Sequence, residues 1–214
     1  MKQISDGTKN IIFDLGGVLL DLDIDRTIQA FQDLGLKDAI KEGGWGYRNK
    51  VFLDMEKGLL NDEEFRNGIR SLLPNGATND EIDAAWCAML VGFDPEKIML
   101  LKHLRLNYKL FLFSNTNNIH LNYFRKLFFD SFGFQLDDLF VKTFYSHEIG
   151  MRKPDLKSFL HVLQEAGIVA HESLFIDDLD LNVEGAKALG IQTVWLKPDM
   201  GLEDVFKSVE KRDR

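Results

Sequence analysis

Residues 11–20 read IIFDLGGVLL. The stretch begins with a short apolar run, residues 11–13, which ends at Asp14, and two glycines follow at positions 16 and 17. Four more short runs rich in aliphatic and aromatic residues follow along the chain, at residues 110–113, 140–144, 174–176 and 193–196. Runs that are short and apolar throughout are typical of strands buried on both faces of a parallel sheet. Residues 11–13 are therefore predicted to form the first strand of such a sheet.

Helical patterns lie between the later runs, at residues 96–106, 119–129, 155–166 and 182–189. Gly167 and Gly190 follow the last two patterns and suit helix ends. Pro154 suits the first turn of the third helix. Strands that alternate with helices predict an α/β fold with a doubly wound parallel sheet.

The segment 23–92 breaks this alternation. It contains no convincing strand, and amphipathic helices are expected at residues 27–34, 62–73 and 80–90, the last two opened by Asn61 and Asn79 as N-caps. We expect a small helical insertion after the first strand, with the core assembled from residues 1–22 and 93–214.

The chain has 214 residues, of which 45% are hydrophobic, and its 26 Lys and Arg against 34 Asp and Glu give a formal net charge of −8. This length fits one globular unit with at most a small second domain. The acidic balance, without a long basic tract, argues against nucleic acid or an anionic membrane surface as the main partner and favours a small molecule. No apolar run approaches the roughly 18 residues that a membrane span requires.

Cys87 is the single cysteine, so an internal disulfide is excluded, and the N-terminal residues 1–10 are polar. Both features lead us to expect a cytoplasmic protein. Cys87 lies beside Trp86 on an apolar helical face and is expected in the core. The sequence does not indicate an oligomeric state.

Polar side chains follow the predicted strands at the point where each strand ends. In an open parallel sheet, ligands bind outside the carboxyl ends of the strands, so these side chains are expected to converge. Separated carboxylates favour a hard cation such as Mg²⁺, while a hydroxyl and an ammonium group suit phosphoryl oxygens. The residues concerned are Asp14, Ser114, Asn115, Lys153, Asp177 and Asp178.

Taken singly, each of these residues has an ordinary structural interpretation. An Asp that closes a strand is usually a turn or cap residue, Ser114 and Asn115 could cap the following helix, and Lys153 could be a solvated surface charge. Their occurrence in order at successive strand ends favours a shared phosphate and metal site.

Four segments resemble the haloacid dehalogenase-like hydrolase superfamily, in the family's order and over nearly the whole chain. They are IIFDLGGVLL around Asp14, LFLFSNTN around Ser114, GMRKPD around Lys153 and LFIDDLDLN around Asp177 and Asp178. The resemblance implies a Rossmann-like core, with residues 23–92 as the helical cap. In most branches it also implies a Mg²⁺-dependent phosphatase with an Asp nucleophile.

The same resemblance implies individual roles. Asp14 would be the nucleophile and a metal ligand, Asp178 the second side-chain ligand and Gly16 a ligand through its carbonyl group. Asp177 and Asn182 would support the metal site. The residues that would bind the phosphoryl group are Ser114, Asn115 and Lys153.

Gly16 departs from the pattern of most family phosphatases, which carry a second Asp there as general acid and base. The sequences of the four segments are most similar to those of the subgroup that includes α-D-glucose-1-phosphate phosphatases, in which Gly is also found at the position of Gly16. The dehalogenase branch usually has an aromatic residue at this position, so Gly16 and the pair Asp177 and Asp178 favour the metal-dependent branch.

The prediction is a Mg²⁺-dependent phosphatase of a small phosphorylated metabolite, working through an aspartyl phosphate at Asp14. The expected substrate is a sugar phosphate, with sugar 1-phosphates among the candidates. One alternative is a catalytically weak ligand-binding relative that lacks the general acid. Another is a phospho-accepting signalling module, although receiver domains place the acidic pair after the first strand; a 2-haloacid dehalogenase is less favoured. Trp45, Tyr47 and Arg48 are candidates for substrate contact, but ordinary packing within the cap is the more frequent role of such residues.

Overall fold

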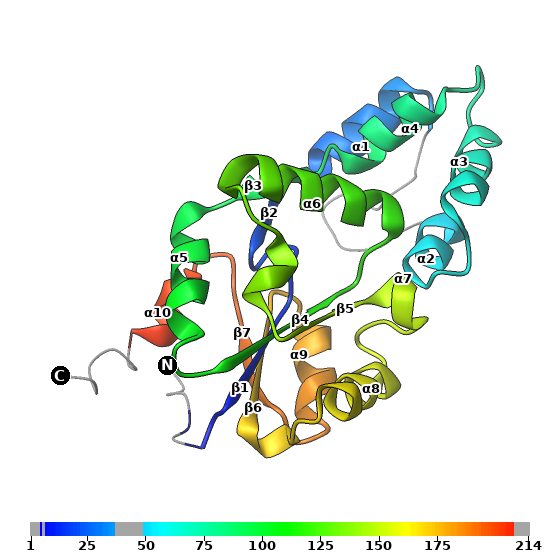
Figure 1. Ribbon diagram of the computed structural model, residues 1–214. Coiled ribbons are helices and arrows are strands. Elements are labelled where there is room, and N and C mark those ends of the chain that lie inside the picture. The colour runs from blue at the N-terminus through cyan, green and yellow to red at the C-terminus, as the bar shows by residue number, and fades with distance from the viewer. Residues whose placement is uncertain (1–4, 6, 37–48, 208–214) are drawn as a thin grey trace.

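The computed structural model describes residues 5, 7–36 and 49–207. A five-stranded parallel sheet forms its centre, in the order β5-β4-β1-β6-β7. The chain enters at the middle strand, adds two strands on one side and then two on the other (Figure 1). The strands are β1 (Asn10–Phe13), β4 (Lys109–Ser114), β5 (Lys142–Tyr145), β6 (Ser173–Asp177) and β7 (Gln192–Trp195).

Helices cover both faces of this sheet, so its central strands are buried on both sides, as their apolar composition predicts. On β1, Ile11 and Phe13 point to one hydrophobic cluster and Ile12 to the other. The first cluster packs under α5 (Pro95–Leu104), α6 (Asn118–Phe132) and α10 (Leu202–Phe206). The second packs under α8 (Leu156–Ala166) and α9 (Asp180–Lys187).

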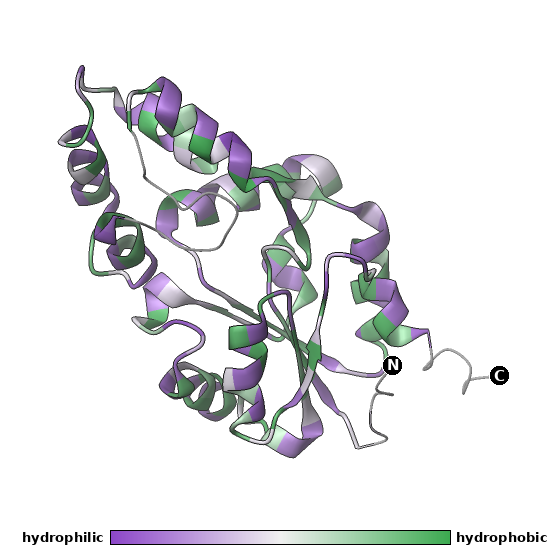
Figure 2. Ribbon diagram, turned by 180° about the vertical axis from the view of Figure 1, so that it is seen from behind, coloured by the Kyte–Doolittle hydropathy of each residue, from purple (hydrophilic) through white to green (hydrophobic). Residues whose placement is uncertain are grey.

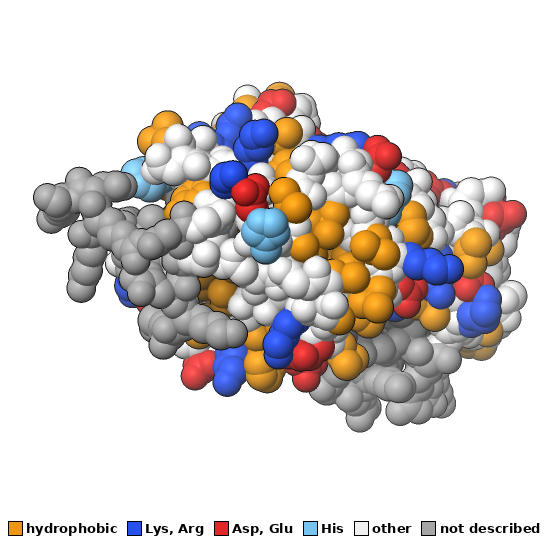
Figure 3. All heavy atoms as spheres, turned by 90° about the horizontal axis from the view of Figure 1, so that it is seen from below, with side chains coloured by type: hydrophobic (Ala, Val, Ile, Leu, Met, Phe, Trp, Pro, Cys, Tyr) orange, Lys and Arg blue, Asp and Glu red, His pale blue; other side chains and the backbone are white. Residues whose placement is uncertain are grey.

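Short elements complete the connections: η1 (Leu136–Leu139), α7 (Ser146–Ile149) and η2 (Ala170–Glu172). Each helix carries both hydrophilic and hydrophobic residues, in keeping with one buried face (Figure 2). The face in Figure 3 shows hydrophobic side chains in patches among charged ones. Within the described ranges, no helix combines the length and the apolar character needed to cross a membrane.

The doubly wound α/β fold is thus confirmed, and each expected strand overlaps an observed one. Two local expectations are wrong. The third strand begins at Lys142 rather than at residue 140, because residues 136–139 form η1 and Phe140 ends that turn. Pro154 precedes Asp155, the N-cap of α8, so it lies outside the first turn of that helix.

A group of helices stands between β2 (Leu20–Leu22) and β3 (Leu90–Phe93), two strands that pair antiparallel. The helices of this helical lobe lie to one side of the main sheet (Figure 1). They are α1 (Ile24–Asp33), α2 (Lys50–Glu56), α3 (Asp62–Arg70) and α4 (Asn79–Cys87). The exact limits 23–92 stay a prediction.

The expectation that residues 23–92 contain no strand is wrong at their C-terminal end. Leu90 and Gly92 pair with β2, which is distant in the sequence, so the expected helix 80–90 ends at Cys87. Asn61 is confirmed as an N-cap, but the N-cap of α4 is Thr78 rather than Asn79. The Thr78 side chain accepts from the Glu81 backbone N–H, and the Glu81 side chain accepts from the Thr78 backbone N–H. This reciprocal capping box makes Thr78, rather than Asn79, the N-cap.

An aromatic cluster holds the helical lobe together. Phe31, Phe52, Phe65 and Trp86 are fully buried, with ring centroids 4.9–6.2 Å apart. Trp86 also stacks on His120 of α6 at 4.4 Å, so the lobe's core continues into that of the sheet domain. Cys87 is buried as expected, and burial raises the pKa of its thiol to about 12. Trp45, Tyr47 and Arg48 lie outside the described residues.

Candidate active site

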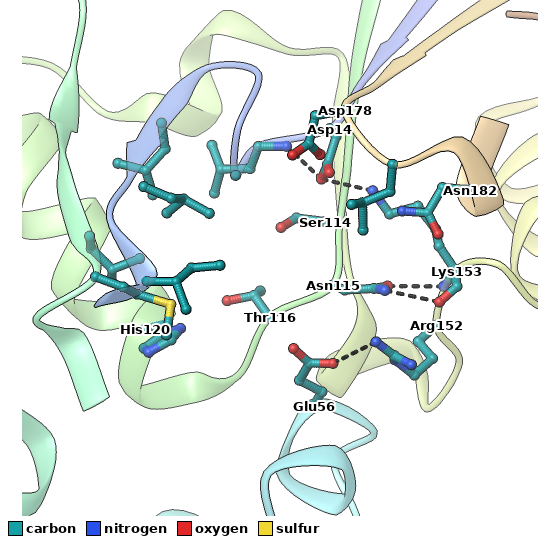
Figure 4. Close-up of a pocket in the computed structure, with 18 of the residues that line it drawn as sticks. Asp14, Glu56, Ser114, Asn115, Thr116, His120, Arg152, Lys153, Asp178 and Asn182 are labelled. Carbon is teal, nitrogen blue, oxygen red and sulfur yellow. Dashed lines mark hydrogen bonds and ion pairs between the residues drawn. The ribbon is translucent and has the colours of Figure 1, made fainter. Parts of the chain in front are cut away.

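The carboxyl ends of β1, β4 and β6 meet at one cavity of about 560 Å³. Phe13 lies in register with Leu112 and Ile176, so the residues that follow these three positions are neighbours. The convergence expected from the strand ends is therefore present (Figure 4). The predicted site residues that line the cavity are Asp14, Gly16, Ser114, Asn115, Lys153, Asp178 and Asn182.

Lys153 lies at the centre of the acidic end of this cavity. Its Nζ is 2.7 Å from Asp14 Oδ1 and 2.7 Å from Asp177 Oδ2, and its side chain is fully buried. Burial alone would lower the pKa of Lys153, but Asp14 and Asp177 raise it above its ordinary value. The ammonium group therefore stays charged and partly neutralises the carboxylates around it.

Asn115 holds Lys153 in place. Its Oδ1 accepts the Lys153 backbone N–H at 2.9 Å, and its Nδ2 donates to the Lys153 carbonyl oxygen at 3.0 Å. Both ends of the Asn115 amide are therefore used on the backbone of residue 153. Direct contact of Asn115 with a phosphoryl group stays a prediction.

Asp177 lies behind the cavity and is fully buried. Its Oδ1 accepts from the Leu179 backbone N–H at 2.9 Å, and the Asn182 Nδ2 donates to both of its oxygens at 3.0 and 3.1 Å. Since Lys153 adds a third partner, Asp177 is saturated with protein donors. These contacts suit a residue that orients its neighbours rather than one that binds a ligand directly.

Of the three clustered carboxylates, those of Asp14 and Asp178 line the cavity. One oxygen each of Asp14, Asp177 and Asp178 lies within 4.8 Å of the others. Burial and the charge of Asp177 raise the pKa of Asp14 well above its ordinary value, against the opposing effect of Lys153. Burial, followed by the charge of Asp177, raises the pKa of Asp178 to about 7.

This end of the cavity fits a divalent cation. Asp178 Oδ1 is buried and has no hydrogen-bond partner among the described residues. With Lys153 as the one ammonium group bonded within this cluster, full ionisation of the three carboxylates would leave two negative charges for a cation to neutralise, and hard oxygen ligands suit Mg²⁺. Gly17 has φ +74°, and a Cβ there would lie 2.3 Å from Asp178 Oδ2, so a side chain at this position would displace the carboxylate.

Gly16 lines the cavity beside Leu22 of β2. A Cβ at position 16 would lie 2.8 Å from Leu22 Cδ1, closer than such atoms pack. Leu22 therefore occupies space that a side chain at position 16 would need.

Five polar residues that the sequence analysis did not assign to the site also line the cavity: Glu56, Thr116, His120, Arg152 and Asp180. Arg152 stands within the GMRKPD segment, and Thr116 and His120 follow the polar end of β4, so proximity in sequence was the available signal. Glu56 comes from α2, for which the sequence gives no clear helical pattern. His120 Nε2 donates to the Trp86 carbonyl oxygen at 2.9 Å, and burial lowers the pKa of this imidazole to about 4, so it is neutral.

The chain matches the family described as haloacid dehalogenase-like hydrolase over residues 8–190. It is 33% identical to the D-ribitol-5-phosphate phosphatase of Bacteroides thetaiotaomicron, over 91% of this chain and 94% of that protein. It is 29% identical to the sesquiterpene phosphatase of Aspergillus oryzae, over 86% and 87% of the two chains.

Solved structures agree with this relationship. A haloacid dehalogenase family enzyme of Bacteroides thetaiotaomicron, crystallised as a magnesium complex, has a TM-score of 0.87 and 38% identity, covering 94% of this chain and 100% of that chain. A hydrolase of the same family from Porphyromonas gingivalis has a TM-score of 0.82 and 33% identity, covering 96% and 97%. The chain therefore belongs to the haloacid dehalogenase-like hydrolases, in their phosphatase branch.

Proposed function

We propose that this protein is a Mg²⁺-dependent phosphatase of a small sugar phosphate or sugar alcohol phosphate, acting through an aspartyl phosphate at Asp14. The observation that carries the proposal is the acidic end of the cavity, where Lys153 joins Asp14 to Asp177 and a buried Asp178 oxygen lacks a partner among the described residues. Its similarity to a D-ribitol-5-phosphate phosphatase supports the substrate class.

Asp14, Asp178 and the Gly16 carbonyl group would hold the metal ion, with Asp177 and Asn182 as the supporting layer. Bound there, Mg²⁺ would supply positive charge to the oxygens of the transferring phosphoryl group. The magnesium complex of the Bacteroides thetaiotaomicron relative supports this choice of metal.

Asp14 would act as the nucleophile. Its Oδ1 accepts from the Leu15 backbone N–H at 2.7 Å and contacts Lys153, which leaves Oδ2 for attack on phosphorus. Attack forms the Asp14–phosphorus bond as the bond to the leaving oxygen breaks, and water then releases inorganic phosphate. The Ser114 hydroxyl and Lys153 Nζ would donate to the phosphoryl oxygens.

Gly16 cannot protonate the leaving oxygen, so the proton must come from solvent, the substrate or another cavity residue. This favours substrates with an easily departing alkoxide, and a sugar 1-phosphate stays a candidate for that reason. The relative is named for D-ribitol 5-phosphate, a substrate with its phosphate at C5 of a sugar alcohol. The comparison therefore supports sugar and sugar alcohol phosphates as a class rather than sugar 1-phosphates in particular.

A panel of phosphate esters tests the proposal. Sugar phosphates, sugar alcohol phosphates, nucleotides and phosphorylated acids would be incubated with Mg²⁺ and, separately, with EDTA. We expect turnover that requires Mg²⁺ and is greatest for hydroxylated esters. Binding of these esters without turnover would favour the inactive relative, and Mg²⁺-independent turnover of 2-haloacids would favour the dehalogenase.

A further inference from the structure

An ion pair between the helical lobe and the sheet domain lines the cavity away from the acidic end. Glu56, the last residue of α2, places its Oε2 2.9 Å from Arg152 Nη2. In Figure 4 the pair lies across the cavity from Asp14 and Asp178, with Ser114 and Thr116 between them. The Glu56 side chain is only 8% exposed, so its charge sits in the cavity wall rather than in open solvent.

The position of Glu56 is fixed relative to the phosphoryl end. Its carbonyl oxygen accepts from Ser146 Oγ at 2.7 Å, and the same buried Ser146 hydroxyl accepts from the Thr116 backbone N–H at 2.9 Å. Thr116 is two residues beyond Ser114 in the loop after β4. One fully buried hydroxyl therefore joins the end of α2 to the loop that directly follows Ser114.

The pair contrasts with the wall beside it, which is apolar and comes mainly from β2, α1 and α2. That wall is formed by Leu20, Leu22, Ile24, Leu53, Met89 and Leu90. A leaving group that enters the cavity thus meets Glu56 and Arg152 as a source of strong hydrogen bonds: a carboxylate that accepts from hydroxyls and a guanidinium that donates to them.

The charges also indicate which leaving groups fit. The Arg152 guanidinium is already engaged by the Glu56 carboxylate, so it is not a free positive charge for a second phosphate or a carboxylate. An apolar leaving group would remove water from the pair without replacing its hydrogen bonds, which is costly. A neutral leaving group with a hydroxyl at the end opposite the phosphate satisfies both groups.

We propose that Glu56 and Arg152 form a hydroxyl-recognition site that determines specificity, selecting phosphate esters whose leaving group is a neutral polyol or sugar. This inference rests on the proposed phosphatase function and assigns the substrate selection to two residues. A site built to bond a substrate hydroxyl discriminates strongly against analogues that lack it.

The test compares two substrates in the wild-type protein and in Glu56→Gln, with Mg²⁺ present. One is the sugar alcohol phosphate that the wild type turns over best. The other is 4-nitrophenyl phosphate, whose aryl group carries no hydroxyl besides the oxygen bonded to phosphorus. The carboxamide keeps the size of Glu56 and the backbone bond to Ser146. We expect kcat/KM to fall about 10- to 100-fold for the polyol ester, mainly through KM, and by a few-fold at most for the aryl ester.

Asp62→Asn is the matched control, because Asp62 Oδ2 also bridges the lobe and the sheet domain, accepting from Asn118 Nδ2 at 2.7 Å, but it does not line this cavity. We expect this variant to leave the ratio of the two kcat/KM values unchanged. Should Glu56→Gln fail to fold, Arg152→Gln is expected to give the same selective loss.

Four outcomes are distinguishable. A loss confined to the polyol ester supports the recognition site. An equal loss on both esters would mean that the pair only fastens the lobe, and an unchanged polyol kcat/KM would remove its role altogether; both overturn the inference. Absence of any phosphatase activity in the wild type would instead refute the proposed function.

Discussion

Replacing Asp178 by asparagine should stabilise the metal-free protein, although it removes a carboxylate from the proposed metal site. In the folded protein this carboxyl is largely buried near Asp177 and Asp14, with Lys153 as a nearby cation already engaged by both of them. Its ionisation is therefore costly in the folded state and easy in the unfolded chain. Asparagine occupies the same space without the charge.

The size of this effect follows from the pKa of Asp178, which burial and Asp177 raise from 3.8 to about 7. Each unit corresponds to 1.36 kcal/mol, so the destabilisation approaches roughly 4 kcal/mol once the group is fully ionised. Because the folded protein retains a proton that the unfolded chain loses, wild-type stability should fall as pH rises from about 4 to about 7 and then level off. In Asp178→Asn, this part of the loss of stability with rising pH should be absent.

Chemical denaturation in EDTA at pH 5 and pH 8 measures this difference. We expect Asp178→Asn to exceed the wild type by about 2–4 kcal/mol at pH 8 and by clearly less at pH 5. Asp180→Asn is the matched control, since it makes the same change at an exposed position in the same segment. With Mg²⁺ the order should reverse, because only the wild type gains binding energy. A variant no more stable than the wild type at pH 8, or equally favoured at both pH values, would refute the reasoning.

Further predictions concern Lys153, Gly16 and the leaving group. Lys153→Met should lower the free energy of unfolding of the metal-free protein by about 3–5 kcal/mol, because two buried carboxylates lose their shared cation; unchanged denaturation curves in EDTA would contradict this. Gly16→Asp should lower kcat/KM through the contact with Leu22, and Leu22→Ala should restore part of it in the double variant; steady-state kinetics that show no loss in the single variant would show that position 16 has room. In the wild type, log(kcat/KM) should fall steeply with leaving-group pKa across an ester series, since Gly16 supplies no proton; a flat series with chemistry rate-limiting would mean that another residue does.

The sheet and the acidic end of the cavity were predictable because local patterns determine them. Continuous apolar runs identify strands buried on both faces, and a parallel sheet brings their carboxyl ends together, so Asp14, Ser114 and Asp178 had to be neighbours. Lys153 joins them at the entrance to α8, although its complete burial between two carboxylates is a tertiary fact.

The remaining features depend on contacts between distant segments. Glu56 reaches the cavity because Ser146 holds the end of α2, and nothing near residue 56 in the sequence reveals that bond. β3 exists because it pairs with β2, while Val91 and Gly92 alone give little strand signal. Asn115 looks like a ligand-binding residue in the sequence, whereas the fold uses its amide to hold the backbone of Lys153.

Covalent trapping at Asp14 is the most direct measurement of the proposed chemistry. The protein would be mixed with Mg²⁺ and its best phosphate ester, quenched in acid during turnover and reduced with borohydride, which converts an aspartyl phosphate to homoserine. Peptide mass spectrometry should find homoserine at position 14 in the wild type and not in the inactive Asp14→Asn control. Rapid Mg²⁺-dependent hydrolysis by Asp14→Asn, with no modification of position 14 in the wild type, would contradict the assignment of Asp14 as the nucleophile.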